Sequence, residues 1–219
     1  FYIMYAYLAS GSAHFHLNDY QNALYFVSLY TDYTWVKEPD EHEMVVINQF
    51  QEWAEGNRYI YLLMAGQFDV LPDYLEYIST KENEIFPALC DIVTAANRYD
   101  INIDFVLEEY KSYFTYQEQS NRIGKVSRQV TDDRYVRLLA GLGTYYLKKN
   151  EFPKGLDFVL DSIRFSIEIS DGRGMLRGVG LFEQYRDYAT DTAIQQYKIL
   201  ISEVQKLNEE KAVFADSYM

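Results

Sequence analysis

The residues that could perform catalysis or bind a metal are few and poorly spaced for either task. The histidines are His14, His16 and His42, and the single cysteine is Cys90. His14 and His16 lie two positions apart in a predicted helix, so their side chains point to different faces and cannot share a metal. One cysteine cannot form an internal disulfide or a cysteine-based metal site. Since no nucleophile–base, zinc-binding or phosphate-binding motif occurs either, we expect no enzymatic activity, no metal and no cofactor.

Acidic side chains outnumber basic ones, and they are unevenly distributed. The net charge of −13 arises in residues 1–117, which contain 18 acidic and 5 basic residues, whereas residues 118–219 contain 15 of each. An acidic surface disfavours direct binding to a phosphate backbone. Adjacent acidic pairs such as Asp132-Asp133 are expected to be solvated. Cations are concentrated in the middle of the chain, where Arg137 and Lys148 could receive a carboxylate.

Composition predicts an all-α fold. Hydrophobic residues make up 48% of the 219 residues, and the chain has 4 prolines and 11 glycines. No Asn-Gly or Asp-Gly turn joins alternating, strand-like segments. No apolar segment reaches the ~18 residues needed to cross a bilayer. Together with the lone cysteine, which is typical of a reducing compartment, this predicts a cytoplasmic protein that does not insert into membranes.

The clearest motif in the chain is a helical hairpin over residues 136–167. Small and large side chains alternate there at fixed spacing: Leu139, Leu142, Gly143 and Tyr146 on the first helix, then Phe152, Gly155 and Val159. This spacing resembles the tetratricopeptide repeat. Gly143 and Gly155 are expected to let the two helices approach closely. One hairpin cannot bury its apolar faces alone, so neighbouring hairpins are expected.

Weaker matches to the same pattern begin near residues 4, 52, 84 and 174. Asn18-Asp19 is expected to end one helix and cap the next, Gly66 to end another, and Leu181 to take the small-residue position of the last repeat. Residues 35–43 are interpreted as an inserted loop, and 170–174 as a plain helix–helix turn. The predicted fold is therefore a right-handed superhelix, or α-solenoid, of about five hairpins. It forms one domain over residues 1–219, with a possible break at 117–131.

A superhelix of this kind has a concave groove lined by the first helix of each hairpin. Such a groove binds an extended peptide or a partner helix. The repeat register places Trp53, Ile60 and Leu63 in this groove, and it indicates a basic sector formed by Arg137, Lys148 and Arg186. The candidate peptide-binding residues are Asn57, Asn97, Arg137, Thr144, Lys148, Tyr185 and Arg186.

The irregular repeats and the segment YYLKKNEFPKGLDFVLDSIRFSIEISD (residues 145–171) resemble the C-terminal domains of bacterial helix-turn-helix transcriptional regulators, the peptide-sensing Rap, PlcR and NprR-type receptors. The resemblance implies a ligand-sensing domain that binds a short peptide in its groove and forms a homodimer. The family's peptide-contacting asparagines have no unique counterpart in this sequence, and Asn57 and Asn97 are candidates because each lies late in, or on, a first helix.

DNA would then be bound by an N-terminal helix-turn-helix domain, which we expect to precede Phe1 because the sequence begins as if inside a helix. The alternative is a tetratricopeptide adaptor that mediates protein–protein interaction with no link to DNA.

Overall fold

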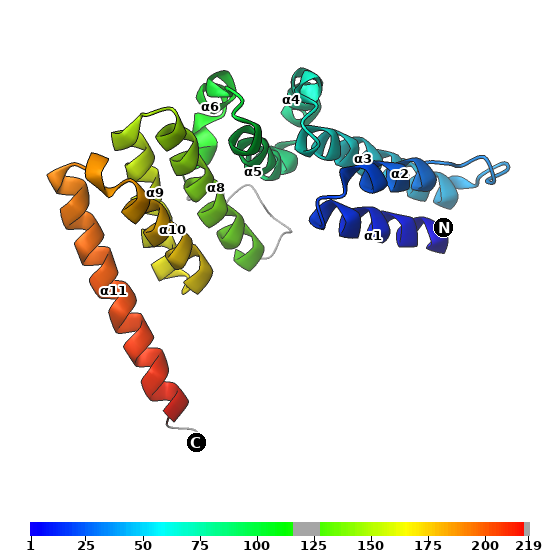
Figure 1. The fold of residues 1–219 in the computed structure, drawn as a ribbon. Coiled ribbons are helices and arrows are strands. Elements are labelled where there is room, and N and C mark those ends of the chain that lie inside the picture. Colours follow the sequence, from blue (N-terminus) through cyan, green and yellow to red (C-terminus); the bar gives the residue numbers. More distant parts are fainter. Residues whose placement is uncertain (116–127, 217–219) are drawn as a thin grey trace. The chain divides into compact units, whose positions relative to one another are not determined.

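The computed structural model describes residues 1–115 and 128–216, and within them all regular structure is helical (Figure 1). The all-α prediction is therefore confirmed for this part of the chain. Two compact units are present, Phe1–Ala95 and Ala96–Met219, and their boundary lies inside one helix. The predicted break at 117–131 falls largely on residues 116–127, outside the described ones.

Unit 1 contains four α-helices, one short 3-10 helix and the first part of a fifth α-helix. They are α1 (Tyr2–His16), α2 (Tyr20–Tyr30), α3 (Glu41–Met64), the short η1 (Phe68–Val70), α4 (Leu71–Ser79) and the first part of α5 (Glu82–Tyr99). Helix α2 packs against both α1 and α3. The core between these three helices is built from Met4, Ala23, Val27, Tyr30, Phe50, Ala54 and Tyr61.

The loop that precedes α3 ends earlier than the predicted residue 43. Asp40 forms a capping box: its carboxylate accepts the Glu43 backbone N–H at 2.8 Å, and the Glu43 carboxylate accepts the Asp40 N–H at 3.1 Å. Two otherwise unpaired donors are satisfied in this way. The helix therefore begins at Glu41 and reaches 24 residues, and it contributes side chains both to the core and to a surface cavity.

Unit 2 contains the end of α5, α6 (Asp104–Glu109), η2 (Lys111–Phe114), α8 (Arg128–Lys148), α9 (Phe152–Glu168), α10 (Gly172–Gln184), η3 (Arg186–Tyr188) and α11 (Asp191–Asp216). Helices α8, α9 and α10 lie side by side, and α11 packs on α9 (Figure 1). Their core includes Leu147, Leu156, Val159, Leu160, Ile163, Phe182, Ala193, Tyr197 and Leu200.

Five helix ends share one turn geometry. Each has a residue with positive φ: Asn18 (61°), Gly66 (88°), Asp100 (55°), Asn150 (62°) and Ser170 (58°). The residue after each donates its backbone N–H to the carbonyl five positions earlier, at 2.8–3.1 Å. This is the Schellman ending, which satisfies carbonyls at the helix C-terminus. The predicted helix ends at Asn18 and Gly66 are confirmed, and Asp19 accepts the Asn22 N–H at 3.3 Å as the predicted cap of α2.

The predicted close approach at Gly143 and Gly155 is also confirmed. A Cβ built on Gly143 would lie 2.7 Å from Val159 Cγ2, and one on Gly155 would lie 2.9 Å from the backbone nitrogen of Leu147. No side chain fits at either position without moving α8 and α9 apart. The hairpin of residues 136–167 is thus held by the two glycines that the sequence singled out.

Two details of the last predicted repeat were wrong. Helix α10 begins at Gly172 because the Asp171 carboxylate accepts the Arg173 N–H at 3.0 Å, so residues 172–174 are helical and not a plain turn. The close-packed small residue is Gly178, whose added Cβ would lie 2.4 Å from Ile163 Cγ1. Leu181 is instead a partly buried side chain packed on the core.

Candidate functional site

Two of the seven predicted binding residues meet in one cavity of unit 2. Asn97, near the end of α5, and Lys148, at the end of α8, line a cavity of about 280 Å³. The other lining residues are Ala96, Asp100, Ile101, Asn102, Tyr145 and Lys149. We refer to it as the Asn97 cavity. The Schellman turn at Asp100 ends α5 there, so the chain reverses beside α8 and places polar groups from residues 97–102 against those of 145–149.

Lys148 is held at the rim of this cavity by two oxygens. Its ammonium donates to the Asn97 carbonyl oxygen at 2.6 Å and to Asp100 Oδ1 at 2.6 Å. The Lys148 side chain keeps 41% of its accessible surface and that of Asp100 keeps 75%. Pairs this exposed contribute little to stability, so the Asp100 carboxylate can be exchanged for another anion at low cost.

Lys149 is anchored on the other side of the cavity. Its ammonium is hydrogen-bonded to Asp104 and lies 3.6 Å from Glu151 Oε1. The hydrogen bond from Lys149 lowers the pKa of the Asp104 carboxyl and raises the pKa of the Lys149 ammonium. Both groups therefore stay charged at neutral pH, which keeps a cationic wall in place.

Tyr145 forms the buried wall between the two lysines. Its hydroxyl donates to Asp104 Oδ1 at 2.9 Å and accepts the Ile103 backbone N–H at 2.9 Å. Burial raises the pKa of the Tyr145 hydroxyl, so it remains neutral and keeps its donor. This pair of bonds orients the start of α6 against α8.

Asn97 has a polar atom without a partner. Its Nδ2 donates to the Gly141 carbonyl at 2.8 Å, whereas its Oδ1 is buried and accepts no hydrogen bond from the described residues. Leaving a buried acceptor unpaired costs about 1–3 kcal/mol. A group of this kind in a native fold calls for an explanation, and an absent donor is the simplest one.

Asn57 lines a second cavity, of about 200 Å³, in unit 1. Trp53 and Ile60 line it as well, but Leu63 is fully buried in the core, so its predicted groove position was wrong. The Asn57 amide donates to the buried Tyr30 hydroxyl at 3.1 Å. We call this the Asn57 cavity.

The remaining predicted residues lie apart from both cavities, since neither lining includes them. Arg137 pairs with Asp133 at 2.8 Å, and Arg186 pairs with Glu183 at 3.0 Å. The Thr144 hydroxyl donates to the Ala140 carbonyl of its own helix at 2.9 Å, and the Tyr185 ring contacts Phe152. Each cation of the predicted basic sector thus has a carboxylate partner of its own.

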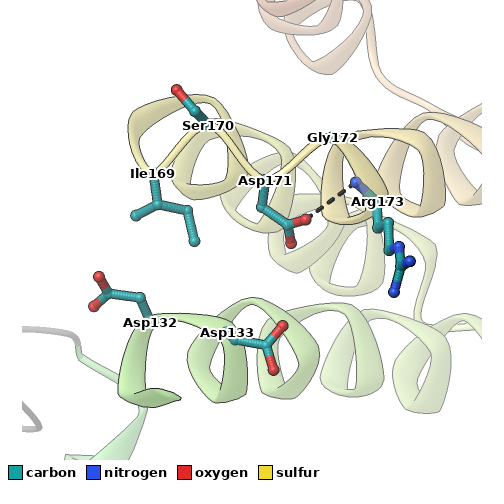
Figure 2. A pocket seen from close by; sticks show the side chains of 7 residues that line it. All are labelled: Asp132, Asp133, Ile169, Ser170, Asp171, Gly172 and Arg173. Carbon is teal, nitrogen blue, oxygen red and sulfur yellow. Dashed lines mark hydrogen bonds between the residues drawn. The ribbon is translucent and has the colours of Figure 1, made fainter. Parts of the chain in front are cut away.

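A larger cavity, of about 690 Å³, lies where the first turns of α8 face the turn between α9 and α10. Figure 2 shows Asp132 and Asp133 on one side and residues 169–173 on the other. Asp171 is committed to capping α10. Asp132 is only 8% exposed, so its predicted solvation was wrong: the residue faces the neighbouring turn. None of the predicted binding residues lines this cavity.

Neither a metal-binding cluster nor a membrane-spanning helix is present in the described part of the chain. Residues 1–115 and 128–216 contain no group of three or more His, Cys, Asp or Glu side chains suited to a metal ion. None of the helices in these ranges combines the length and the apolar character required to cross a membrane.

Sequence reasoning missed Asp100, Tyr145 and Lys149 in unit 2, and Tyr77 and Glu84 in unit 1. The adjacent pair Lys148-Lys149 was a usable signal for the first cavity. Nothing in the sequence pairs either lysine with an acid about 45 positions away.

Comparisons of the chain with protein-family models, with curated proteins and with solved structures found no match.

Proposed function

We propose that this chain is a tetratricopeptide-like superhelix of about five hairpins that binds a short peptide. In this proposal it is the ligand-sensing and oligomerisation domain of a transcriptional regulator whose DNA contacts belong to a separate helix-turn-helix domain. Two hairpins, α1–α2 and α8–α9, support the repeat architecture. Both have a glycine facing the partner helix, Gly11 and Gly143, and both turn through a left-handed asparagine, Asn18 and Asn150.

The observation that carries the peptide assignment is the unpaired Oδ1 of Asn97. A peptide backbone offers N–H donors at regular intervals, and an asparagine amide has the matching donor and acceptor geometry. One peptide N–H would satisfy the Asn97 acceptor once the side chain turns Oδ1 from its buried position toward the cavity, and would recover the free energy that its burial costs.

Lys148 supplies the second contact in this proposal. Its ammonium lies against the carbonyl of Asn97 and the exposed carboxylate of Asp100. A carboxylate on the ligand, either the peptide C-terminus or an acidic side chain, would replace Asp100 as the partner of Lys148. Charge-assisted bonds of this type contribute about 1.5–3 kcal/mol, which corresponds to roughly tenfold or more in affinity.

The test uses pools of short synthetic peptides with free or amidated C-termini. Binding is measured by calorimetry to the wild type, Asn97→Leu, Lys148→Met and Lys198→Met. We expect at least one pool to bind the wild type and Lys198→Met equally, because Lys198 is exposed on α11 and provides a charge-matched control. The same pool should bind about tenfold more weakly to Asn97→Leu and to Lys148→Met. Absence of binding by every pool, or equal binding to all variants, would contradict the proposal.

Oligomerisation is supported by helix α1. Residues 1–18 contain no Asp, Glu, Lys or Arg, although unit 1 is strongly acidic. Tyr2, Ile3 and Tyr5 are 94%, 57% and 49% exposed. An uncharged apolar face is where two acidic copies can meet with the least repulsion.

Light scattering should give a dimer mass for the wild type and a monomer mass for the double variant Tyr2→Arg, Ile3→Arg. A wild-type monomer at high concentration would favour the alternative, an adaptor whose α1 face docks a different protein without any link to DNA.

A further inference from the structure

The Asn57 cavity is lined by aromatic rings, carboxylates and amides. Helix α3 contributes Glu52, Trp53, Gly56 and Asn57, which follow one another at helical spacing along a single face. Tyr77 comes from α4 and Glu84 from the first turn of α5. All these residues belong to unit 1. The cavity therefore combines aromatic surface with two carboxylates.

The aromatic walls are held in place by their neighbours. The Trp53 ring meets Phe50 edge-on, with 5.4 Å between ring centroids. The Tyr77 ring packs against Tyr59 at 5.4 Å, and its hydroxyl donates to the Glu52 carbonyl at 3.3 Å. Gly56 allows Tyr77 to lie this close, because a Cβ on Gly56 would be 3.1 Å from the Tyr77 hydroxyl oxygen. The ring faces are thus preorganised rather than free to collapse into the cavity.

Two of the side chains that line this cavity, Glu52 and Tyr77, already contact a cation. The Lys81 ammonium lies 2.7 Å from Glu52 Oε1 and 4.4 Å from the centre of the Tyr77 ring. Its side chain is only 25% exposed. The same carboxylate and the same ring that line the cavity therefore bind an ammonium group within the chain itself. A ring face with a carboxylate beside it attracts a cation both through the ring quadrupole and through charge.

The second carboxylate of the cavity has no such partner. Glu84 is exposed, and none of the described cations forms an ion pair with it. Trp53, which has the ring type that binds cations best, lines the same cavity and is 36% exposed. The cavity thus offers a second aromatic face and a second carboxylate beyond the pair that Lys81 occupies.

We propose that the Asn57 cavity is a docking site for the arginine or lysine side chain of a basic partner polypeptide, with Lys81 as the internal cation that competes for part of it. The acidic charge of residues 1–117 would attract such a partner over a distance of about a Debye length. This site is independent of the Asn97 cavity, which lies in the other unit and has cationic walls.

Trp53 makes the test direct, because the chain has only two tryptophans, Trp35 and Trp53. In a Trp35→Phe background, Trp53 emission is titrated with the peptide acetyl-Gly-Arg-Gly-amide. The control peptide has citrulline in place of arginine, which keeps the shape of the side chain and removes its charge. We expect saturable binding of the arginine peptide and at least about threefold weaker binding of the citrulline peptide, as for a partly exposed cation–π contact.

Removal of the internal cation should strengthen binding. Lys81→Met is expected to tighten binding of the arginine peptide about threefold or more, whereas Lys81→Arg, which keeps a cation there, should leave the affinity unchanged.

Glu84→Gln should weaken binding of the arginine peptide by a similar factor. Lys37→Met removes the same charge from an exposed loop position of unit 1 and should have no effect. Helical circular dichroism equal to that of the wild type establishes that each variant is folded.

Three results would overturn the proposal. They are the absence of saturable binding in folded Lys81→Met, equal affinity for the arginine and citrulline peptides, and a gain in Lys37→Met equal to that in Lys81→Met. Because Trp53 reports only on unit 1, a failure here is distinguishable from a failure of the peptide pools at the Asn97 cavity.

Discussion

The two asparagine cavities are similar in plan and differ in the balance of charge on their walls. In each, an asparagine on a long helix lines a cavity of about 200–280 Å³. The Asn57 cavity has aromatic rings and the carboxylates of Glu52 and Glu84. The Asn97 cavity has the ammonium groups of Lys148 and Lys149 beside one aromatic ring, Tyr145, and one carboxylate, Asp100. The asparagine alone therefore does not set the chemistry of a cavity; the side chains around it do.

The two asparagine side-chain amides also differ in their hydrogen bonding. Asn57 donates to the buried Tyr30 hydroxyl and so ties α3 to α2. Asn97 donates to Gly141 and retains a buried acceptor with no partner among the described residues. A satisfied amide is explained by stability, while an unsatisfied one leaves an acceptor available to a donor from outside the described residues. This difference is why we place the peptide proposal in unit 2.

The largest expected effect is a difference in stability between alanine variants of two glycines, one in hairpin α8–α9 and one in hairpin α1–α2. Gly155→Ala should lower the free energy of unfolding by about 1–3 kcal/mol, because the new Cβ would lie 2.9 Å from the Leu147 backbone, which cannot easily move. Gly11→Ala should stay within about 1 kcal/mol of the wild type. There the nearest atom is Phe26 Cβ at 3.2 Å, and alanine is the better helix former. Urea unfolding measures both variants, and equal losses would show that the hairpins are packed alike.

The second comparison exchanges each asparagine for leucine. Asn57→Leu should cost about 1–3 kcal/mol of unfolding free energy, because the fully buried Tyr30 hydroxyl loses its partner. Asn97→Leu should be nearly neutral: it removes an unpaired acceptor, and the Gly141 carbonyl lies inside α8, where the helix supplies a partner. A loss in Asn97→Leu as large as that in Asn57→Leu would mean that Asn97 is structural.

The smallest expected effect is the change with pH in the stability that Asp104 contributes through its bond from Lys149 in unit 2. The folded state lowers the pKa of Asp104, chiefly through its bond from Lys149. Asp104 therefore contributes stability that is fully present above the unfolded value of about 3.9 and is lost as pH falls through the lower, folded pKa. The difference in unfolding free energy between the wild type and Asp104→Asn should be constant from neutral pH to about 5 and should shrink below about 4.

Asp19→Asn is the matched control in unit 1. The pKa of Asp19 is also lowered, mainly by its bond from the Asn22 side chain. Asparagine caps a helix about as well as aspartate does, so at neutral pH this exchange should change the unfolding free energy less than Asp104→Asn does. A flat difference for Asp104→Asn across the whole range would show that the Lys149 contact contributes nothing to folding.

Local features of this chain could be predicted because they depend on residues close in sequence. The Schellman endings at Asn18 and Gly66, the cap at Asp19 and the glycine contacts between α8 and α9 all follow from spacing within one hairpin. The small-residue position of the last repeat was wrongly assigned to Leu181 because the pattern within one helix does not distinguish Leu181 from Gly178, which lies one turn earlier. Only packing against Ile163 distinguishes the two positions.

The sequence by itself determined the helical class, the hairpin of residues 136–167 and the division into an acidic and a neutral half, because helix periodicity, turn chemistry and charge are properties of neighbouring residues. Tertiary structure alone decided which groups meet in the cavities. Lys148 reaches the carbonyl of Asn97 across 51 positions and Asp100 across 48, and Lys81 reaches Glu52 across 29. Such pairs form only after helices pack, since a side chain's partner depends on the distance between helices and on their rotation, which a one-residue change in register alters.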